Sequence, residues 1–592
     1  MWDLRRILAA WVIITTLASL VLASDAQHLP LGTQISVFPL QENEGTPDLF
    51  PMPLCGSFPL EEATIDDMQQ AMSEGSLTAV QLTICYLQRN YQLQSYTNSL
   101  LQLNPDVLQI AASLDAERAA GHVRSPLHGI PFTVKDNIAT KDNMETTAGS
   151  FALLGSIVPR DAHVVSKLRE AGAVLFGKAT LSEWADMRSS NYSEGYSARG
   201  GQARSAYNLT RNPGGSSSGS GIAVGSNAIA FSLGTETDGS VISPAERNAI
   251  VGFKPSVGLT SRAGVIPESV HQDTVGTFAR TVRDAVYALD AIYGPDPRDN
   301  YTSAQGGHTH PNGYTPFLRN RTSLTNATFG IPWTTFWTYA TSEQRTTLAH
   351  LISLIESAGG TVLNNTELPN ASTIISPTGW DWDYGTTRGF PNESEFTVVK
   401  VDFYNNIATY LSELNNTNIR SLSDIVRYNN ENSGTEGGTP YIEGNGNIAF
   451  YSGQDSFLAS LESGGVRDEI YYQALHFTQS TCKDAIDYAL TAYTRDPLSA
   501  LLVPSSVGQT YQVAAQAQYP VLTIPMGYHD QEGDHGMPWG LSLMQSMWGE
   551  AELVRWGSAL EDLVRTEGPE IRLGRRRPRW LGWRERNLPV PF

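Results

Sequence analysis

The sequence predicts an α/β fold built on a parallel or mixed β-sheet, and three observations support this prediction. Residues 161–178, DAHVVSKLREAGAVLFGK, give an amphipathic helix, a glycine stop and an apolar strand in succession, the usual unit of such a sheet. Helical and strand-like segments also alternate before this unit, and apolar strands return near the C-terminus. With 592 residues, 41% hydrophobic and 17% charged, the chain is globular and can bury a sizeable core.

The N-terminal segment, MWDLRRILAAWVIITTLASLVLASDAQ, has the order of a secretory signal. Two arginines precede an apolar run, and small residues follow it. The sequence therefore predicts a signal peptide over residues 1–23, cleaved after Ala23 or Ala26, and a secreted product. An uncleaved signal anchor is the alternative, because the run is near the lower length limit for spanning a bilayer. No later stretch is long and apolar enough to span, so no stable membrane association is expected.

Two amphipathic helices and a buried strand are expected next. The helices begin after Thr64 and Ser76, and the first ends at Gly75. Their apolar faces are formed by Ile65, Met68 and Met72 in the first helix and by Val80, Ile84 and Leu87 in the second. The segment HGIPFTVKDNI then predicts a short buried strand that ends near Lys135.

The later part of the chain changes character twice. From about 295 to 446 it is rich in Asn, Thr, Gly and Pro, which predicts a surface-rich insertion or subdomain. The segments ALLVPSS and YPVLTIPMGY then predict a return to apolar strands. Residues 566–592 contain the basic run RLGRRRPRWLGWRER and are expected to form an exposed tail.

Net charge and cysteine content exclude some classes of function. The formal net charge of −20 argues against nucleic acids and anionic membrane surfaces as partners. The three cysteines, Cys55, Cys85 and Cys482, make at most one disulfide, so the fold does not depend on a disulfide framework. Composition leaves the oligomeric state open, a homodimer included.

Nine N-x-S/T sequons agree with export and are candidate glycosylation sites. They are Asn191, Asn208, Asn300, Asn320, Asn326, Asn364, Asn370, Asn392 and Asn415. An Asn- and Thr-rich chain produces several sequons by chance, so they only support the prediction of export.

Two polar clusters interrupt the apolar pattern. NPGGSSSGSG, residues 212–221, could be a flexible linker, a phosphate-binding loop or a catalytic nest of backbone N–H groups. It lacks the Lys-Ser/Thr ending of a P-loop and runs directly into an apolar stretch, which favours the nest. It also matches the G-x-S-x-G elbow of α/β-hydrolases with Ser217 at its centre, although that elbow must follow a strand immediately. The second cluster, GTETDGS, ends at Ser240 after an apolar strand.

Four motifs together resemble the amidase signature family. GIPFTVKDNI, NPGGSSSGSG, GTETDGSVISPA and VGFKPSVGLTSRAGVIP occur in the order and near the spacing of that family, most similar to its fungal and peptide-amidase-like branch. The resemblance implies a large twisted mixed β-sheet flanked by α-helices. It implies one amidase signature domain over about 60–565 with its catalytic core at 129–267. The expected substrate is a small-molecule or peptide amide, and no cofactor or metal is expected.

The family implies a catalytic group of two serines and a lysine, which falls on Lys135, Ser216 and Ser240. Lys135 would be the base, Ser216 the relay and Ser240 the nucleophile. Elementary chemistry agrees, because amide hydrolysis needs an activated hydroxyl, a proton shuttle and an oxyanion site, and no histidine lies inside the motifs. A buried lysine can serve as a base because desolvation lowers its pKa.

The turn before Ser240 is the expected oxyanion site, formed by the N–H groups of Thr237, Asp238, Gly239 and Ser240, with Ser216 also contacting substrate. Here Asp238 replaces a glycine of the commoner family pattern, and the arginine that often follows is absent. An α/β-hydrolase-type esterase using Ser217 and a catalytically inactive amidase-fold protein are the alternative hypotheses. The motifs HTH and HDQEGDH could be metal ligands by residue type but are expected to be solvated loops. The aromatic segments PWTTFWTY and GWDWDYG could line an acyl pocket, pack in the core or form a covering loop.

Overall fold

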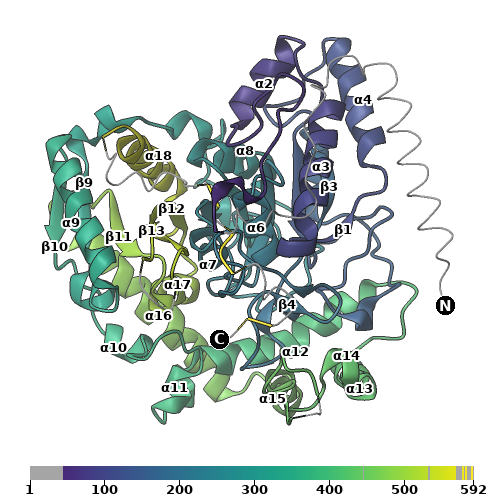
Figure 1. Cartoon of the computed structure of the whole chain (residues 1–592). Coiled ribbons are helices and arrows are strands. Elements are labelled where there is room, and N and C mark those ends of the chain that lie inside the picture. The colour runs from purple at the N-terminus through teal and green to yellow at the C-terminus, as the bar shows by residue number, and fades with distance from the viewer. Residues whose placement is uncertain are drawn as a thin grey trace.

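The computed structural model describes residues 45–443, 446–530 and 534–567 and the short pieces 577–578, 580–582 and 589–590. The predicted signal peptide and most of the basic C-terminal run lie outside these residues. The described residues contain one eleven-stranded sheet in the order β1-β3-β2-β6-β8-β7-β12-β13-β11-β9-β10. Parallel and antiparallel pairs both occur in it, and helices flank it, so the predicted mixed α/β fold is confirmed (Figure 1).

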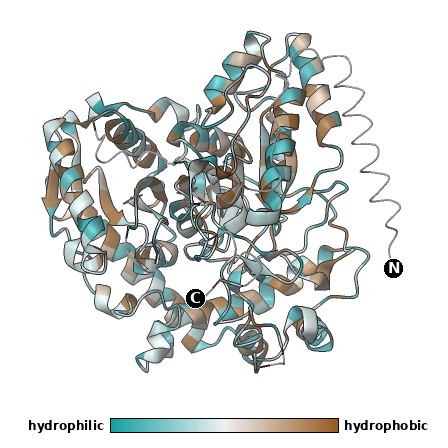
Figure 2. Cartoon of the chain, in the orientation of Figure 1, coloured by the Kyte–Doolittle hydropathy of each residue, from teal (hydrophilic) through white to brown (hydrophobic). Residues whose placement is uncertain are grey.

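The strands of this sheet are short. They are β1 (Leu100–Leu103), β2 (Pro131–Lys135), β3 (Val174–Ala179), β6 (Phe231–Glu236), β7 (Val251–Lys254), β8 (Thr274–Ala279), β9 (Thr328–Ile331), β10 (Thr361–Asn364), β11 (Ala500–Pro504), β12 (Val521–Tyr528) and β13 (Pro538–Met544). Every residue of β2, β3, β6 and β8 is buried. Buried strands read as continuous apolar runs, which is why the sequence identified β2, β3, β11 and β12. Figure 2 shows this hydrophobic character along the strands.

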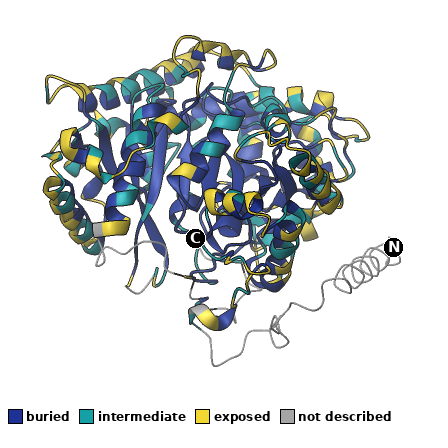
Figure 3. Cartoon of the chain, turned by 90° about the horizontal axis from the view of Figure 1, so that it is seen from above, coloured by how far each residue is buried: buried dark blue, intermediate teal, exposed yellow. Residues whose placement is uncertain are grey.

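The helices cover the sheet, and their outer faces carry most of the exposed residues (Figure 3). The longer ones are α2 (Ile65–Ser73), α3 (Ala79–Thr97), α4 (Val107–Ala119), α5 (His163–Glu170), α6 (Ser218–Gly225), α8 (Val282–Ile292), α9 (Ser342–Ser357), α12 (Glu395–Glu413), α13 (Leu422–Glu431), α15 (Asp455–Ser463), α16 (Glu469–Thr491), α17 (Gly508–Gln516) and α18 (Glu550–Glu567). The shorter ones are α7 (Ile242–Glu246), α10 (Ala371–Ile374), α11 (Tyr384–Thr387) and α14 (Ser433–Glu436). Among the described residues, no helix is both long and apolar enough to cross a membrane.

The caps and buried faces of the first two helices agree only in part with the sequence prediction. Helix α2 begins after Thr64, whose side chain and Asp67 form a capping box, and its predicted apolar face is buried. Helix α3 is capped by Thr78, so the predicted cap at Ser76 is wrong. Its predicted face is only half-buried, because the helix is longer than expected and turns another side toward the core. The buried apolar residues are Ala79, Leu82, Tyr86, Leu93 and Tyr96.

Residues 295–446 contribute to the sheet as well as to the surface. Strands β9 and β10 lie inside this region and form one end of the sheet, parallel to each other. Helix α12 packs against α15 and α16. The region expected as a surface-rich insertion or subdomain thus also supplies β9 and β10, which complete the sheet beside β11.

The C-terminal segment is not simply an exposed tail. Trp580 is 1% exposed, and its ring meets the ring of Phe50 at 4.5 Å between centroids. The backbone N–H of Trp580 donates to the carbonyl of Ala206, and the backbone N–H of Leu209 donates to the carbonyl of Leu581. The prediction of an exposed tail is wrong for this part of the segment. Burying the Trp580 indole in the core stabilises the docked segment more than its neighbouring charged residues favour solvent.

Candidate active site

Strands β2 and β6 carry the predicted site residues to one edge of the sheet. They pair in parallel, with Phe132 beside Phe231 and Val134 beside Leu233, so both strands end at the same edge. Lys135 is the last residue of β2. Strand β6 ends at Glu236 and leads into residues 237–240, called the serine turn below.

Three side chains meet at this edge in a chain of hydrogen bonds. Lys135 Nζ donates to Ser216 Oγ at 2.7 Å, and Ser216 Oγ donates to Ser240 Oγ at 2.8 Å. Lys135 and Ser216 are fully buried, and Ser240 is 5% exposed. The structure thus brings together three residues that are 81 and 24 positions apart in the sequence.

Thr235 completes the surroundings of the lysine. Lys135 Nζ also donates to Thr235 Oγ1 at 3.0 Å and to the Thr235 carbonyl at 3.3 Å. The amide of Asn137 donates to the same hydroxyl at 2.9 Å. Sequence reasoning missed both residues, and the only signal was a threonine at the end of an apolar strand. Lys135 Nζ therefore has three acceptors around it, Ser216 Oγ and the two oxygens of Thr235, which fix its position beside Ser216.

Burial makes the neutral form of Lys135 accessible. Desolvation, opposed in part by four carboxyl groups, lowers its pKa from 10.5 to about 8. These groups belong to Glu268, Asp186, Glu194 and Asp273. Burial also raises the pKa of each of the four, so they are weaker counter-ions than exposed carboxylates would be.

The serine turn is held from both sides. Glu236 Oε2 accepts the N–H groups of Val241 at 2.6 Å and Ile242 at 2.9 Å, where α7 begins. Gly239 has φ +88°, and a Cβ added there would lie 2.5 Å from Cε2 of Tyr511. Both the backbone conformation and the close aromatic ring require glycine at this position.

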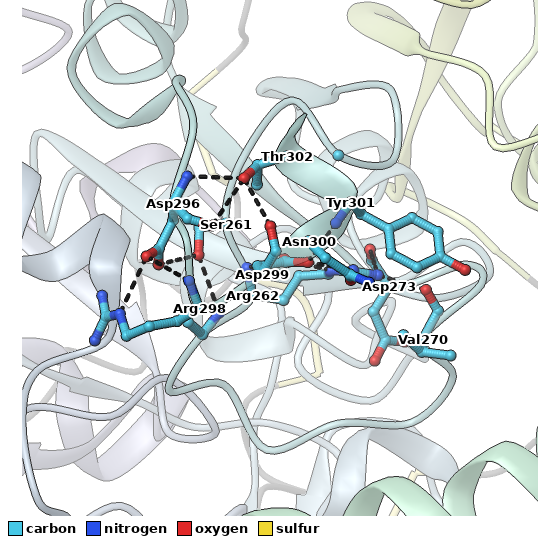
Figure 4. A network of polar contacts seen from close by, with 12 residues as sticks. Ser261, Arg262, Val270, Asp273, Asp296, Arg298, Asp299, Asn300, Tyr301 and Thr302 are labelled. Atoms are coloured by element: carbon cyan, nitrogen blue, oxygen red, sulfur yellow. Dashed lines mark hydrogen bonds and ion pairs between the residues drawn. The ribbon is translucent and has the colours of Figure 1, made fainter. Parts of the chain in front are cut away.

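A polar network fixes the loop behind Thr237 (Figure 4). Thr237 Oγ1 donates to Asp273 Oδ1 at 2.6 Å. Arg262 binds Asp299 through two nitrogens at 2.7 and 2.8 Å, and it donates to the Val270 carbonyl at 2.6 Å. Bidentate guanidinium–carboxylate pairs have defined geometry, so the network positions the loop that presents Asp273 to the turn.

The aromatic segment GWDWDYG covers the turn. Trp380 Nε1 donates to Asp238 Oδ2 at 2.5 Å, and Trp382 stacks on Phe396 with 4.8 Å between ring centroids. The other aromatic segment, PWTTFWTY, packs inside: Trp337 is fully buried and donates to the Leu502 carbonyl. Of the roles considered for these segments, core packing holds for Trp337, and GWDWDYG contacts the serine turn through Trp380.

Ser217 does not occupy a nucleophile elbow. Residues 203–217 form no strand, and Ser217 directly precedes α6. Its hydroxyl is fully buried and donates to the Thr235 carbonyl at 3.1 Å. The α/β-hydrolase alternative lacks the strand that it requires.

The histidine motifs are loops. His308 stacks on Trp548, and His310 packs against Phe317. His529 and His535 lie between the antiparallel strands β12 and β13, and residues 531–533 of their motif are outside the described residues. In the part of the chain that the structure describes, no group of three or more His, Cys, Asp or Glu side chains could hold a metal ion.

The predicted glycosylation sites differ in exposure. Asn392 is half-buried, whereas Asn208 is buried and its amide donates to the His535 carbonyl at 3.0 Å. Leu581 of the C-terminal segment pairs with Asn208 as an isolated bridge, so this predicted site is the least accessible of the nine. The exposed sites are Asn191, Asn300, Asn320, Asn326, Asn364, Asn370 and Asn415.

Comparison with known proteins gives the family. Residues 81–426 match the amidase family. A protein of Schizosaccharomyces pombe that carries the name amidase is 56% identical over 552 residues, covering 92% of this chain and 91% of its own length. The structure of a peptide amidase with the competitive inhibitor chymostatin has a TM-score of 0.76 and 36% identity, covering 88% of this chain and all of the other. The native peptide amidase of Stenotrophomonas maltophilia has a TM-score of 0.74 and 35% identity, covering 86% and 98%.

The match covers more than half of the chain and includes Lys135, Ser216 and Ser240. The Schizosaccharomyces relative aligns over nearly the whole length of both proteins. The chain therefore belongs to the amidase family, as its motifs indicated, and is a hydrolase of amide C–N bonds.

Proposed function

We propose that the chain hydrolyses its substrate through an acyl-enzyme, with Ser240 as nucleophile, Ser216 as relay and neutral Lys135 as base. The observation that carries this proposal is the continuous chain of hydrogen bonds from Lys135 Nζ through Ser216 Oγ to Ser240 Oγ. The lowered pKa of Lys135 supports the role of base, because a general base must be unprotonated near the working pH.

In the acylation step, Lys135 Nζ accepts the proton of Ser216 while Ser216 accepts the proton of Ser240. Ser240 Oγ bonds to the amide carbon, and the carbonyl electron pair moves to oxygen. The N–H groups of the serine turn would hold that oxyanion. Ser216 then donates a proton to the leaving nitrogen and regains one from Lys135, so the C–N bond breaks and ammonia or an amine leaves.

Deacylation follows the same relay with water in place of Ser240. Ser216 accepts a proton from the attacking water and passes its own to Lys135. The ester carbon then forms a bond to the water oxygen and releases Ser240, which takes back a proton through Ser216. The products are a carboxylic acid and the starting enzyme, so no cofactor takes part in the balance.

Similarity to solved peptide amidases supports one class of substrate. The two peptide amidase structures cover 86–88% of this chain at 35–36% identity, which supports a peptide amide as substrate. Small aliphatic and aryl amides are the other candidates. Comparing turnover of a dipeptide amide, its free acid and a simple aliphatic amide of similar size separates these classes.

A covalent serine probe tests the proposed nucleophile. The wild-type protein should be labelled by a fluorophosphonate at Ser240, and Ser240→Ala should lose both labelling and turnover while keeping its fold. Ser217→Ala, the matched neighbouring hydroxyl, should keep labelling and most of the turnover. Labelling that maps to Ser217 would overturn the proposal, and an unlabelled, inactive wild type would favour a catalytically silent protein.

A further inference from the structure

Two carboxyl groups meet directly behind the serine turn. Asp238 belongs to the turn, and Glu395 is the first residue of α12, in the region 295–446. Their side chains are hydrogen-bonded to each other; burial raises the pKa of both groups, and contact with Glu395 raises that of Asp238 further. Two carboxyl groups in contact cannot both be ionised, so the pair must share a proton.

The neighbours of Glu395 identify it as the ionised partner. Its oxygens accept from the amides of Gln272 at 2.7 Å, Gln516 at 2.9 Å and Gln512 at 3.2 Å. The amide nitrogen of Gln512 also donates to the Asp381 carbonyl at 2.8 Å, which fixes its orientation as a donor. Glu395 is 3% exposed and surrounded by donors, as an acceptor-only carboxylate requires.

The neighbours of Asp238 identify it as the protonated partner. Its Oδ2 accepts the indole N–H of Trp380 at 2.5 Å. Its Oδ1 is wholly buried and meets no N–H or O–H donor among the described residues. An ionised carboxylate would leave that oxygen with an unmet charge, whereas a carboxylic acid can donate from it to Glu395.

We propose that Asp238 is a positioning residue that acts in its neutral form, donating its proton to Glu395 and so fixing the serine turn against α12. The proposal rests on the proposed function, in that Ser240 is the nucleophile so positioned. Gln272 strengthens the link, because its amide lies 3.5 Å from the Thr237 carbonyl as well as on Glu395. A glycine at position 238 could not make this connection, since it has no side chain.

The neutral form also suits the chemistry. The oxyanion forms beside this turn, and a negative charge on Asp238 would oppose it in a medium of low dielectric. Burial, followed by the charge of Glu395, raises the pKa of Asp238 well above its usual value. The other titratable groups that act on or respond to Asp238 are Glu236 on β6, Lys254 on β7, Cys482 on α16 and Tyr511 on α17.

The first test compares Asp238→Asn with Asp238→Ala. Asparagine keeps a donor toward Glu395 and an acceptor for Trp380, so turnover should stay within about threefold of wild type. Alanine loses both bonds, so turnover should fall by about tenfold or more, the factor expected for one or two hydrogen bonds. Equal losses in the two variants would overturn the proposal.

The second test follows the melting temperature against pH, which a purely steric role would not move. The unfolded Asp238 ionises near pH 4 while the folded one keeps its proton, so wild type loses stability as the pH rises through that window. Asp238→Asn does not titrate. Its melting temperature relative to wild type should therefore increase with pH above about 4, and a constant difference would contradict the proposal.

The same pair of proteins, with and without Asp238→Asn, is then compared in a Glu395→Gln variant as a control. Without the Glu395 charge, the proton on Asp238 is held less tightly, so the pH dependence of the Asp238→Asn effect should shrink in Glu395→Gln protein. An unchanged dependence would show that Glu395 does not hold the proton. Both tests stand apart from the proposed function: if the probe labels Ser240 in wild type but these effects are absent, only the role of Asp238 is wrong.

Discussion

Ser216 Oγ lies 2.8 Å from Ser240 Oγ, and the same hydroxyl lies 2.7 Å from Lys135 Nζ. One buried hydroxyl therefore stands between the lysine and the most exposed of the three groups. Each of the three comes from a different local element: the end of β2, the loop that leads into α6 and the turn after β6. The parallel pairing of β2 and β6 is what makes these elements meet.

Replacing Lys135 by arginine should remove the base and keep the positive charge. Arginine stays protonated at accessible pH, so it cannot accept the Ser216 proton. Turnover should fall by roughly two or more decades, the size expected for loss of a general base. The measurement is kcat on a peptide amide together with circular dichroism, to confirm that the variant folds.

Lys178 is the matched control. It is also fully buried, with a pKa lowered by burial to about 8, but it donates to the Ile138 carbonyl and Thr146 Oγ1. Lys178→Arg should reduce stability without a comparable loss of turnover per folded molecule. Near-normal turnover in Lys135→Arg would show that only the charge matters, and the serine–serine–lysine mechanism would fail.

Both turnover and stability should depend on pH through the ionisation of Lys135. Turnover should fall on acidification through a pKa of about 8, because protonated Lys135 is not a base. The free energy of unfolding should depend on the same group. Between about pH 8 and pH 10.5 the unfolded lysine holds a proton that the folded one releases. The contribution of Lys135 to stability therefore grows as the pH rises through this range and is lost as the pH falls. Lys135→Met lacks this dependence, and parallel stability curves for it and wild type would contradict the assignment.

Gly239→Ala should damage the serine turn. The new Cβ would face the Tyr511 ring at 2.5 Å and would occupy a left-handed backbone conformation. We expect turnover to drop by at least tenfold, since a misplaced nucleophile loses its near-attack geometry. Gly307→Ala is the control: φ is +85° there, but no atom lies within 4 Å of the added Cβ. If both variants behave alike, backbone strain and not the Tyr511 contact is responsible.

The parts of the site that the sequence predicted are those encoded locally. Lys135 ends one apolar strand and Ser240 follows another, and the order of the four motifs, which resembles the amidase signature family, implies that the two act together. The strand-forming segments themselves were found because buried strands are continuous apolar runs. The fold class needed no more than these local signals, whereas the roles of the three central residues came from the resemblance of the motifs to the amidase signature family.

The contacts that sequence reasoning did not predict span long separations. Glu395 reaches Asp238 from α12, and Trp380 reaches it from a loop 142 positions away. Trp580 packs on Phe50 across the whole chain. Nothing in the local pattern around these residues indicates a partner, because the contact depends on how helices pack against the sheet and not on periodicity.

Export of the protein remains a proposal, and the Cys55–Cys85 disulfide supports it. Structural disulfides persist mainly in oxidising compartments. Protein recovered from the culture medium should begin near Ser24 or Gln27 when its N-terminus is sequenced. Membrane-bound material that still begins at Met1 would favour the signal anchor instead.

If the protein is exported, glycans should be found on exposed sequons and not on the buried one. Asn208 is 6% exposed and its amide nitrogen is engaged by the His535 carbonyl, so an attached glycan would displace both that bond and the nearby C-terminal segment. Asn415 is exposed. Peptide mapping should find no glycan at Asn208, and Asn208→Gln should leave the electrophoretic mobility unchanged, whereas Asn415→Gln should increase it if that site is used. A glycan on Asn208 would mean that residues 580–582 do not pack against this loop in the secreted protein.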